Sequence, residues 1–274
     1  MTIEKKFEEQ VKEGTRFNFG KNWNAFLSNL DGERIRVAED SLTEMLECEN
    51  LNNKTFLDIG CGSGLFSLAA QNLSADVYSL DFDPDSVACA KFLKEKFHPQ
   101  SKWTIEEGSV LDKDYIASLG EFDVVYSWGV LHHTGNMELA LSNATLPVKS
   151  GGKLFIGIYN ESKQSKFWLK VKEMYNKNIF GKALIVSIFV TYFFIRGFFS
   201  DILRLKNPFK RYEEYKQRRG MSIVHDWYDW LGGLPYEVAT PEFIVDFHKK
   251  RGFRVEKIRT VNTKGINEFV FSKV

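Results

Sequence analysis

A glycine-rich turn between a short apolar run and a helical pattern constrains the fold more than any other feature. Residues 55–64 read TFLDIGCGSG, so glycine stands at every second position from Gly60 to Gly64. The bulky residues before the turn suit a strand covered on both faces, and the glycines allow a sharp turn that a ligand can approach closely. A helix expected from Ser63 to about Asn72 then points its first N–H groups at whatever lies on the turn.

An acidic residue ends the second apolar strand of the pattern. Residues 76–81 read DVYSLD, and the carboxylate of Asp81 at the strand end can accept hydrogen bonds from two ribose hydroxyls. The nearest competing pattern is the Rossmann dinucleotide fingerprint, which requires glycine or alanine three residues after its second glycine. Leu65 stands at that position, and this disfavours an enzyme that binds NAD.

Strand and helix patterns alternate along most of the chain, which is typical of a parallel sheet with helices on both faces. Asp83-Pro84 supplies an N-cap and a first-turn proline for one helix, and Thr240-Pro241 starts the last one. We expect strands at 55–60, 76–81, 102–107, 122–128, 152–159, 254–261 and 267–272, and helices at 3–13, 31–49, 63–72, 84–96, 136–146 and 240–251.

Five motifs stand in the order and at the distances found in class I S-adenosylmethionine (SAM)-dependent methyltransferases, which the chain resembles over about residues 54–158. They are the glycine turn, the strand ending at Asp81, residues 107–112, residues 122–133 with their His-His ending, and the turn at 150–154. The chain is most similar to the quinone-biosynthesis-type enzymes. This resemblance implies an α/β, Rossmann-like fold with a seven-stranded, mostly parallel sheet, helices on both faces and a helical cap inserted after strand five.

The resemblance also implies how SAM, and its product S-adenosyl-L-homocysteine (SAH), would be held. The glycines admit the methionine and ribose portion, Asp58 meets the amino group, and Asp81 holds the ribose hydroxyls with Phe82 against the adenine. The cofactor-binding residues expected on this basis are Phe19, Trp23, Asp58, Gly60, Gly62, Gly64, Asp81, Phe82, Ser109, Val110, Trp128 and His132.

Histidines supply the candidates for a general base. Methyl transfer from a sulfonium needs alignment above all, and a hydroxyl or thiol acceptor also benefits from a base that works near neutral pH. His133 follows the fourth strand at its carboxyl end, where ligands bind in such sheets. His225 and Asp229 are four residues apart and would share a helix face, so His133, His225 and Asp229 are the candidate catalytic residues.

Aromatic residues are dense between residues 219 and 237, where the chain also turns sharply at two glycines and a proline. One interpretation is an acceptor pocket that encloses an apolar or ring-shaped molecule; the other is a compact structural corner filled by tryptophans. The pocket interpretation gives Tyr159, Trp227, Trp230, Tyr236 and Glu237 as substrate-binding residues.

The domain organisation follows from these patterns. Residues 1–50 form an N-terminal helical lid segment, 51–160 the SAM-binding core, 161–239 a helical and aromatic cap insertion, and 240–274 the last helix and strand hairpin of the core. The aromatics between Phe17 and Trp23 are unlikely to be bare surface, and either form a lid over the site or staple the segment to the sheet.

An uncharged apolar run at 183–195 lies within the insertion, between Lys182 and Arg196. It is shorter than the roughly 18 to 20 residues that span a bilayer. A helix that is apolar all round is either buried in protein or placed at a membrane. We expect a buried cap over the substrate site, with membrane-surface contact as the alternative.

Composition and charge limit the kinds of partner and the cellular location expected for this protein. Lys+Arg 37 against Asp+Glu 36 gives a net charge of +1, which argues against a nucleic-acid partner. The three cysteines show no ligand spacing, and the charged start is no signal peptide, so a cytoplasmic protein is expected. Residues 126–129 read YSWG in place of the signature of base-modifying methylases, which disfavours methylation of DNA or RNA bases. The sequence contains no trio of acidic residues that would indicate a metal site.

The sequence therefore predicts a metal-independent SAM-dependent methyltransferase that methylates a small or amphiphilic acceptor, at oxygen by preference. The alternatives are a membrane-surface enzyme acting on a lipid or quinone and a non-catalytic, regulatory SAM-binding protein. The acceptor itself is set by pocket shape and not by these motifs.

Overall fold

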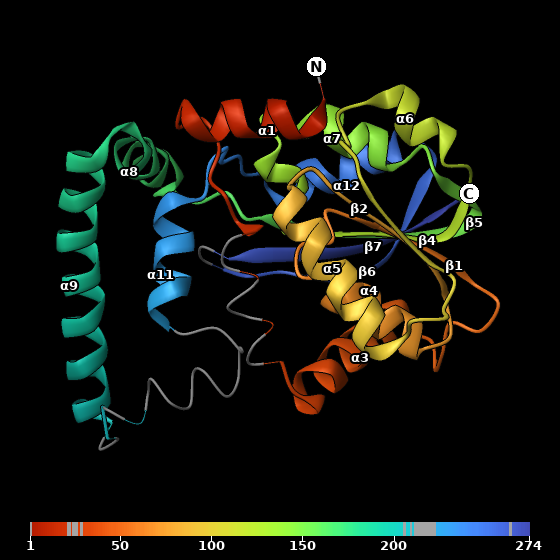
Figure 1. Ribbon diagram of the computed structural model, residues 1–274, viewed down its shortest axis with the longest axis horizontal. Helices are drawn as coiled ribbons and strands as arrows, with labels where there is room; N and C mark the ends of the chain where they lie inside the picture. The colour runs from red at the N-terminus through yellow and green to blue at the C-terminus, as the bar shows by residue number, and fades with distance from the viewer. Residues whose placement is uncertain are drawn as a thin grey trace.

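The computed structural model describes residues 2–20, 23, 27, 30–204, 207–208, 210, 223–262 and 265–274, with the backbone alone at 223–226 and 229. These residues build one seven-stranded sheet in the order β3-β2-β1-β4-β5-β7-β6, which confirms the predicted fold class (Figure 1). Only β7 runs antiparallel to its neighbours β5 and β6, as the predicted hairpin requires. The strands are β1 Thr55–Ile59, β2 Asp76–Asp81, β3 Trp103–Glu107, β4 Phe122–Trp128, β5 Val148–Tyr159, β6 Phe253–Arg259 and β7 Ile266–Lys273.

Helices cover both faces of the sheet because alternate strand residues point to opposite sides. Phe56 of β1 and Phe155 of β5 pack with one set of helices, whereas their neighbours Leu57 and Leu154 pack with the other. The first set is α3 Gly32–Leu46, α4 Leu65–Asn72 and α5 Pro84–Phe97, and the second is α6 Lys113–Ser118, α7 Met137–Ala144 and α12 Pro241–Lys249.

Local capping explains where these helices begin. The Asp83 side chain accepts a hydrogen bond from the Asp85 N–H at the start of α5, and Pro84 occupies the first turn. Thr240 caps α12 in the same way through the Phe243 N–H. Such side chains satisfy N–H groups that have no partner inside the helix, so these two starts were predictable from sequence.

The insertion between β5 and α12 contributes α8 Ser165–Lys177, α9 Ile179–Leu203 and α11 Ile223–Gly232. Together with the turn that follows α11 they form a third hydrophobic cluster beside the sheet. In Figure 1 α9 is the outermost element, and α8 and α11 lie between it and the sheet. The N-terminal helix α1 Ile3–Lys12 runs along the same end of the sheet as α8.

The expectation of a buried cap helix at 183–195 is wrong. The helix runs for 25 residues, and its most apolar window of 18 residues is only 11% buried. The predicted run was too short because Ile179 and Phe180 extend it on one side and residues 198–203 on the other. By length and composition α9 could cross a membrane. The apolar composition predicted a helix here. It could not show that α8 and α11 cover only one face of α9.

Two smaller differences concern the core. Strand β5 begins at Val148, four residues before the predicted start, because Val148 pairs with Phe122 before the register shifts. The short helix α6 was not predicted, since its six residues carry too few apolar positions to show a period.

Candidate cofactor and acceptor site

The glycine turn lies at the carboxyl end of β1, and its backbone needs glycine. Gly60, Gly62 and Gly64 have φ angles of 76°, 53° and 80°, in the left-handed region that other residues rarely adopt. Close neighbours add to this requirement. A Cβ on Gly60 would lie 2.3 Å from Cγ1 of Val130, and one on Gly64 would lie 2.8 Å from Cα of Ala90.

Asp81 joins the end of β2 to this turn. Its Oδ2 accepts a hydrogen bond from the Gly62 N–H at 2.8 Å, and its Oδ1 accepts one from the Asp83 N–H at 2.9 Å. Burial raises the pKa of Asp81 to about 6, while the two N–H donors act in the opposite direction. The carboxylate that the sequence predicted for the ribose therefore lies directly beside the glycine turn.

Asp58 stabilises the glycine turn from its position inside the sheet. Its Oδ2 accepts a hydrogen bond from Ser67 Oγ at 2.5 Å, and Ser67 Oγ lies 2.7 Å from Ser79 Oγ. The indole N–H of Trp103 donates to Ser79 and completes this buried chain. Burial raises the pKa of Asp58 to about 7, so this carboxyl group titrates near neutral pH.

Residues 108–110 lie next to the end of β2, where the adenine was expected. The Gly108 N–H donates to the carbonyl of Asp81 at 2.9 Å, and the side-chain amide of Asn143 donates to the carbonyl of Val110 at 2.8 Å. The Ser109 hydroxyl accepts a bond from the Leu111 N–H. Ser109 and Val110 are thus brought to the same edge as Asp81.

The N-terminal segment crosses the carboxyl ends of the strands. The Gly20 N–H donates to Oδ2 of Asp83 at 2.8 Å, and Nη1 of Arg16 donates to the carbonyl of His133 at 3.2 Å. The indole of Trp23 lies over the glycine turn, 3.2 Å from the point where a Gly62 Cβ would be. These contacts place the segment over the same edge of the sheet as the predicted cofactor residues.

Phe19 and Phe82 are positioned by contacts that involve the N-terminal segment. The Phe19 ring lies 5.2 Å from the His133 ring, and the guanidinium of Arg16 lies 4.9 Å from the centre of the Phe82 ring. Phe82 also meets Phe7 of α1 edge to face at 5.9 Å. Sequence reasoning did not single out Arg16, although an arginine inside an aromatic run is a signal that it covers rings.

The two histidines form a buried pair in the short helix η1 Leu131–His133 that follows β4. His132 Nδ1 accepts a hydrogen bond from the Tyr159 N–H, so its proton resides on Nε2, which is buried and has no partner among the described residues. His133 Nδ1 donates to the carbonyl of Pro235 at 2.5 Å, which leaves Nε2 as an acceptor.

Burial also decides the charge of this pair. It lowers the pKa of His133 to about 3 and the pKa of His132 well below its ordinary value, with the charge of Lys172 adding to the effect on both. Both imidazoles are therefore neutral at physiological pH.

An aromatic cluster surrounds Tyr159 at the end of β5. Ring centres lie 4.1 Å away for His132, 5.8 Å for Trp230 and 5.7 Å for Tyr236. Lys172 of α8 enters this cluster with only 1% of its surface exposed and donates to the backbone carbonyl of Trp230. Its ammonium lies 4.7 Å from the Trp230 ring centre and 4.9 Å from that of Tyr236.

Lys172 was missed because lysine is seldom fully buried. A signal was present in the spacing, since Lys172 follows Trp168 by four residues and precedes Tyr175 by three on α8. Residues so spaced share a helix face, and both aromatics are buried. A lysine on an otherwise buried face was thus visible in the sequence.

Three other predicted residues lie away from the cluster. The Trp128 indole, which was expected among the cofactor-binding residues, donates to Oε1 of Glu268 at 2.8 Å and so reaches over β5 toward β7. Trp227 packs 5.5 Å from Phe193 of α9. Glu237 accepts bonds from the Met137 N–H and caps α7. The side chains of His225 and Asp229 lie outside the described part, although both residues belong to α11.

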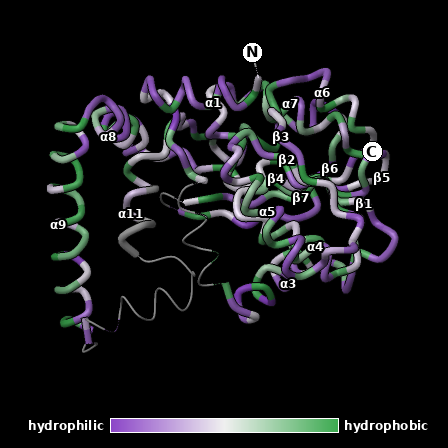
Figure 2. The backbone as a smooth tube through the Cα atoms, viewed as in Figure 1, coloured by the Kyte–Doolittle hydropathy of each residue, from purple (hydrophilic) through white to green (hydrophobic). Residues whose placement is uncertain are grey.

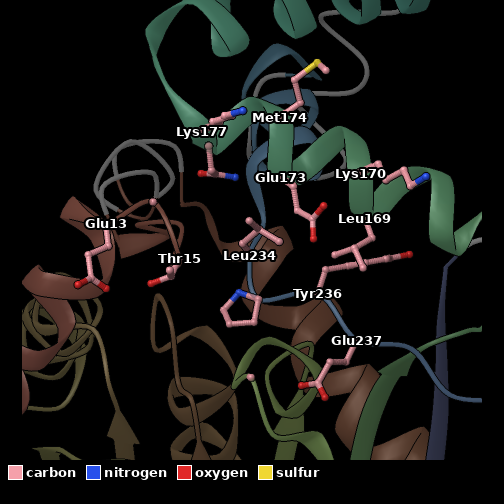
Figure 3. Close-up of a pocket in the computed structure, with 14 residues that line it drawn as sticks. Glu13, Thr15, Leu169, Lys170, Glu173, Met174, Lys177, Leu234, Tyr236 and Glu237 are labelled. Atoms are coloured by element: carbon pink, nitrogen blue, oxygen red, sulfur yellow. The ribbon is translucent and has the colours of Figure 1, made fainter.

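A groove of about 770 Å³ opens on the outer side of the turn at 234–237 (Figure 3). Leu169 and Glu173 of α8 form one wall, Leu234 and Tyr236 form the other, and Thr15 lies at one end. The groove adjoins the cluster through Tyr236 but none of the predicted cofactor residues lines it. Among the described residues, no group of three His, Cys, Asp or Glu side chains is placed to hold a metal ion.

The open sheet with an antiparallel β7, the glycine turn and the acid beside it define the class of SAM-dependent methyltransferases. A family model described as the methyltransferase domain matches residues 50–218, which is more than half of the chain. The chain therefore belongs to this family, and the predicted class is confirmed.

The curated relatives belong to the same class of enzyme. The ubiquinone biosynthesis O-methyltransferase of Coxiella burnetii (strain RSA 493 / Nine Mile phase I) is 26% identical over 150 residues, or 55% of this chain and 59% of the relative. The protein of that name from Pelagibacter ubique is 26% identical over 143 residues, or 51% of this chain and 58% of the relative. The match thus spans less than two thirds of these relatives.

Solved structures show the same fold. Magnesium protoporphyrin IX methyltransferase from Synechocystis PCC 6803 with bound SAH superimposes with a TM-score of 0.54 at 14% identity, covering 93% of this chain and 94% of that one. An O-methyltransferase family protein from Burkholderia thailandensis gives a TM-score of 0.51 at 13% identity, covering 87% of this chain and 57% of that one.

Proposed function

We propose that this chain transfers a methyl group from SAM to an oxygen atom of a small or amphiphilic acceptor. The observation that carries the proposal is the position of the half-buried Asp81 carboxylate against the left-handed glycine turn. The curated relatives are named O-methyltransferases, which favours oxygen as the methylated atom.

The residues at this edge fit SAM. The turn needs glycine because added Cβ atoms would collide with Val130 and Ala90, and glycine lets a ligand approach the backbone closely. Asp81 accepts the ribose hydroxyls, and Asp58 accepts the amino group directly or through water. Phe82, Ser109 and Val110 flank the adenine. SAM supplies a methyl group already activated on a sulfonium, so the protein has to align the acceptor with it.

His133 is the candidate base on the acceptor side. Because its Nδ1 donates to Pro235, its Nε2 holds a lone pair that can accept a hydrogen bond from an acceptor hydroxyl. With a pKa of about 3 the imidazole stays neutral until the hydroxyl gives up its proton in the transition state. His225, which precedes Asp229 by four residues on α11, is the second candidate for this role.

The aromatic cluster suits an acceptor that is apolar or carries a ring. Tyr159, Trp230 and Tyr236 gather beside His132 and His133, and aromatic faces bind rings by stacking and edge contacts. Tyr236 also lines the groove of Figure 3, so an amphiphilic acceptor could extend from the cluster into it.

A second candidate function is methylation of a lipid or quinone at a membrane surface. The observation that favours it is α9, which is apolar, long and largely exposed. The non-enzymatic candidate, a SAM-binding regulatory protein, shares the cofactor site and differs in turnover.

The test is calorimetric titration of the protein with SAH, followed by a methyl-transfer assay with radiolabelled SAM and a panel of phenols and hydroxy acids. We expect a dissociation constant in the micromolar range and label transfer to at least one hydroxylated acceptor. No binding of SAH would refute the proposal. Binding without transfer, in the presence and absence of vesicles and lipid acceptors, would favour the regulatory candidate.

A further inference from the structure

The exposed apolar side chains of the described residues concentrate on α9. Ten of the twenty large hydrophobic side chains that are exposed belong to this helix, including Phe180 at 82% and Phe199 at 59% exposure. Phe180, Leu184, Ile188, Ile195 and Phe199 recur at spacings of four and seven, which places them on one face. We call this the outward face of α9, and Figure 2 shows that apolar residues predominate along the helix, interrupted by a few hydrophilic ones.

We propose that the outward face of α9 docks on a bilayer surface that carries anionic headgroups, with the helix lying along the surface. This deepens the membrane-surface candidate above by naming the face, its orientation and the lipid charge. It stands even if the acceptor is soluble.

The opposite face of α9 is already held by the protein. Ile185 is buried, and the Phe189 ring packs 5.4 Å from Trp168 of α8. Phe193 packs 5.5 Å from Trp227 of α11. A spanning helix would have lipid around its circumference, and these contacts would have to break. The geometry therefore favours a helix that lies in the interface with one face immersed.

The charges on α9 fit such a surface. Its ionisable residues are Lys182, Arg196 and Asp201; the two cations are exposed and the acid is buried. None belongs to the outward face. Lys182 lies over the Tyr175 ring of α8 at 5.3 Å, on the side of α9 that packs against the protein, whereas Arg196 directly follows the outward residue Ile195 and is exposed. Long cationic side chains at the border of an apolar face reach lipid phosphates while their stems stay in apolar surroundings.

The sequence after α9 extends this positive charge. Residues 204–219 contain seven lysines and arginines against two glutamates. Basic residues near an anionic membrane surface are attracted to its headgroups. Anionic headgroups would supply the charge that complements these lysines and arginines.

Docking at α9 would place the bilayer one helix away from the aromatic cluster. Trp227 of α11 contacts Phe193 of α9, and Trp230, one turn further along α11, contacts Tyr159. An amphiphilic acceptor dissolved in the bilayer would thus lie near the elements that carry the proposed pocket.

The experiment is flotation of the full chain with vesicles of phosphatidylcholine alone and of phosphatidylcholine mixed with phosphatidylglycerol, at low and high salt. The test variant carries Leu184→Glu and Ile188→Glu on the outward face. The matched control carries Val37→Glu and Phe92→Glu, which also replace exposed apolar residues on helices, here α3 and α5.

We expect binding to the mixed vesicles, weaker binding at high salt, and a loss of more than about tenfold in the test variant but not in the control. Unchanged SAH binding in the test variant shows that it folds and separates this proposal from the proposed function. Equal vesicle binding by test variant and wild type would overturn the proposal. So would the absence of binding by the wild type, or concentration-dependent dimerisation that the test variant abolishes.

Discussion

The Gly62 N–H donates a hydrogen bond of 2.8 Å to the carboxylate of Asp81, which joins the loop after β1 to the end of β2. β1 and β2 are neighbouring parallel strands, so their carboxyl ends meet at one edge of the sheet. The contact fixes the glycine turn and at the same time holds the acid where a ribose would reach it.

Replacement of Asp81 should weaken cofactor binding. Asp81→Ala removes a charged acceptor, and hydrogen bonds to charged groups contribute about 1.5 to 3 kcal/mol, so SAH affinity should fall roughly 10- to 100-fold. Calorimetry measures this. Asp76→Ala at the other, exposed end of β2 is the control and should bind SAH normally. Unaltered affinity in Asp81→Ala would show that this carboxylate does not hold the ribose.

Binding of SAH should release a proton from Asp58 near neutral pH. Its raised pKa of about 7 means that a large fraction is protonated there, and a bound ammonium group favours the ionised form. Affinity should therefore fall as the pH drops below 7. Titrations in buffers with different ionisation enthalpies measure the released proton. Asp58→Asn should abolish the release, and an identical release in that variant would assign it to another group.

Loss of His133 should reduce turnover more than cofactor affinity. His133→Gln keeps a donor for Pro235 but removes the basic nitrogen, and general bases contribute about 10²- to 10⁴-fold. Because burial lowers the pKa of His133 to about 3, its ionisation should not produce a fall in rate between pH 5 and 7. Rates over this range, with His98→Gln as a surface control, measure both effects. Undiminished turnover in a chain with both His133→Ala and His225→Ala would contradict the assignment of a histidine base.

Alanine substitutions at two glycines with left-handed backbone angles should distinguish an effect on stability from an effect on SAH binding. Gly62 and Gly151 have φ angles of 53° and 73°, but only an added Cβ at Gly62 would meet a neighbour, the Trp23 indole. Gly62→Ala and Gly151→Ala should each lower the free energy of unfolding by about 1 to 2 kcal/mol. Only Gly62→Ala should also weaken SAH binding. Denaturant unfolding and calorimetry provide the two readouts. Equal SAH affinities of the two variants would show that the glycine turn is not part of the cofactor site.

Much of the core could be predicted because its signals are local. The caps at Asp83 and Thr240 are visible in sequence, since side-chain oxygens that satisfy free N–H groups act within a few residues. The bulky apolar residues of β1 and the alternation of strand and helix patterns likewise predicted a sheet covered on both faces.

The candidate site was predictable only where strand ends carry it. Gly62, Asp81 and His133 lie at or shortly after the carboxyl ends of strands, so parallel pairing brings them to one edge. Trp128 also lies at a strand end, but its indole donates to Glu268 of β7, and a direction across the sheet depends on a neighbour 140 residues away.

The sequence by itself determined the class of this protein, since the glycines, the strand-end acid and the order of motifs act through backbone sterics and chain direction. Only the tertiary structure decided that Arg16 and Lys172 approach the histidine pair and that α9 keeps one apolar face exposed. The physical reason is that burial depends on which distant segments meet, and an apolar side chain carries no record of its partner.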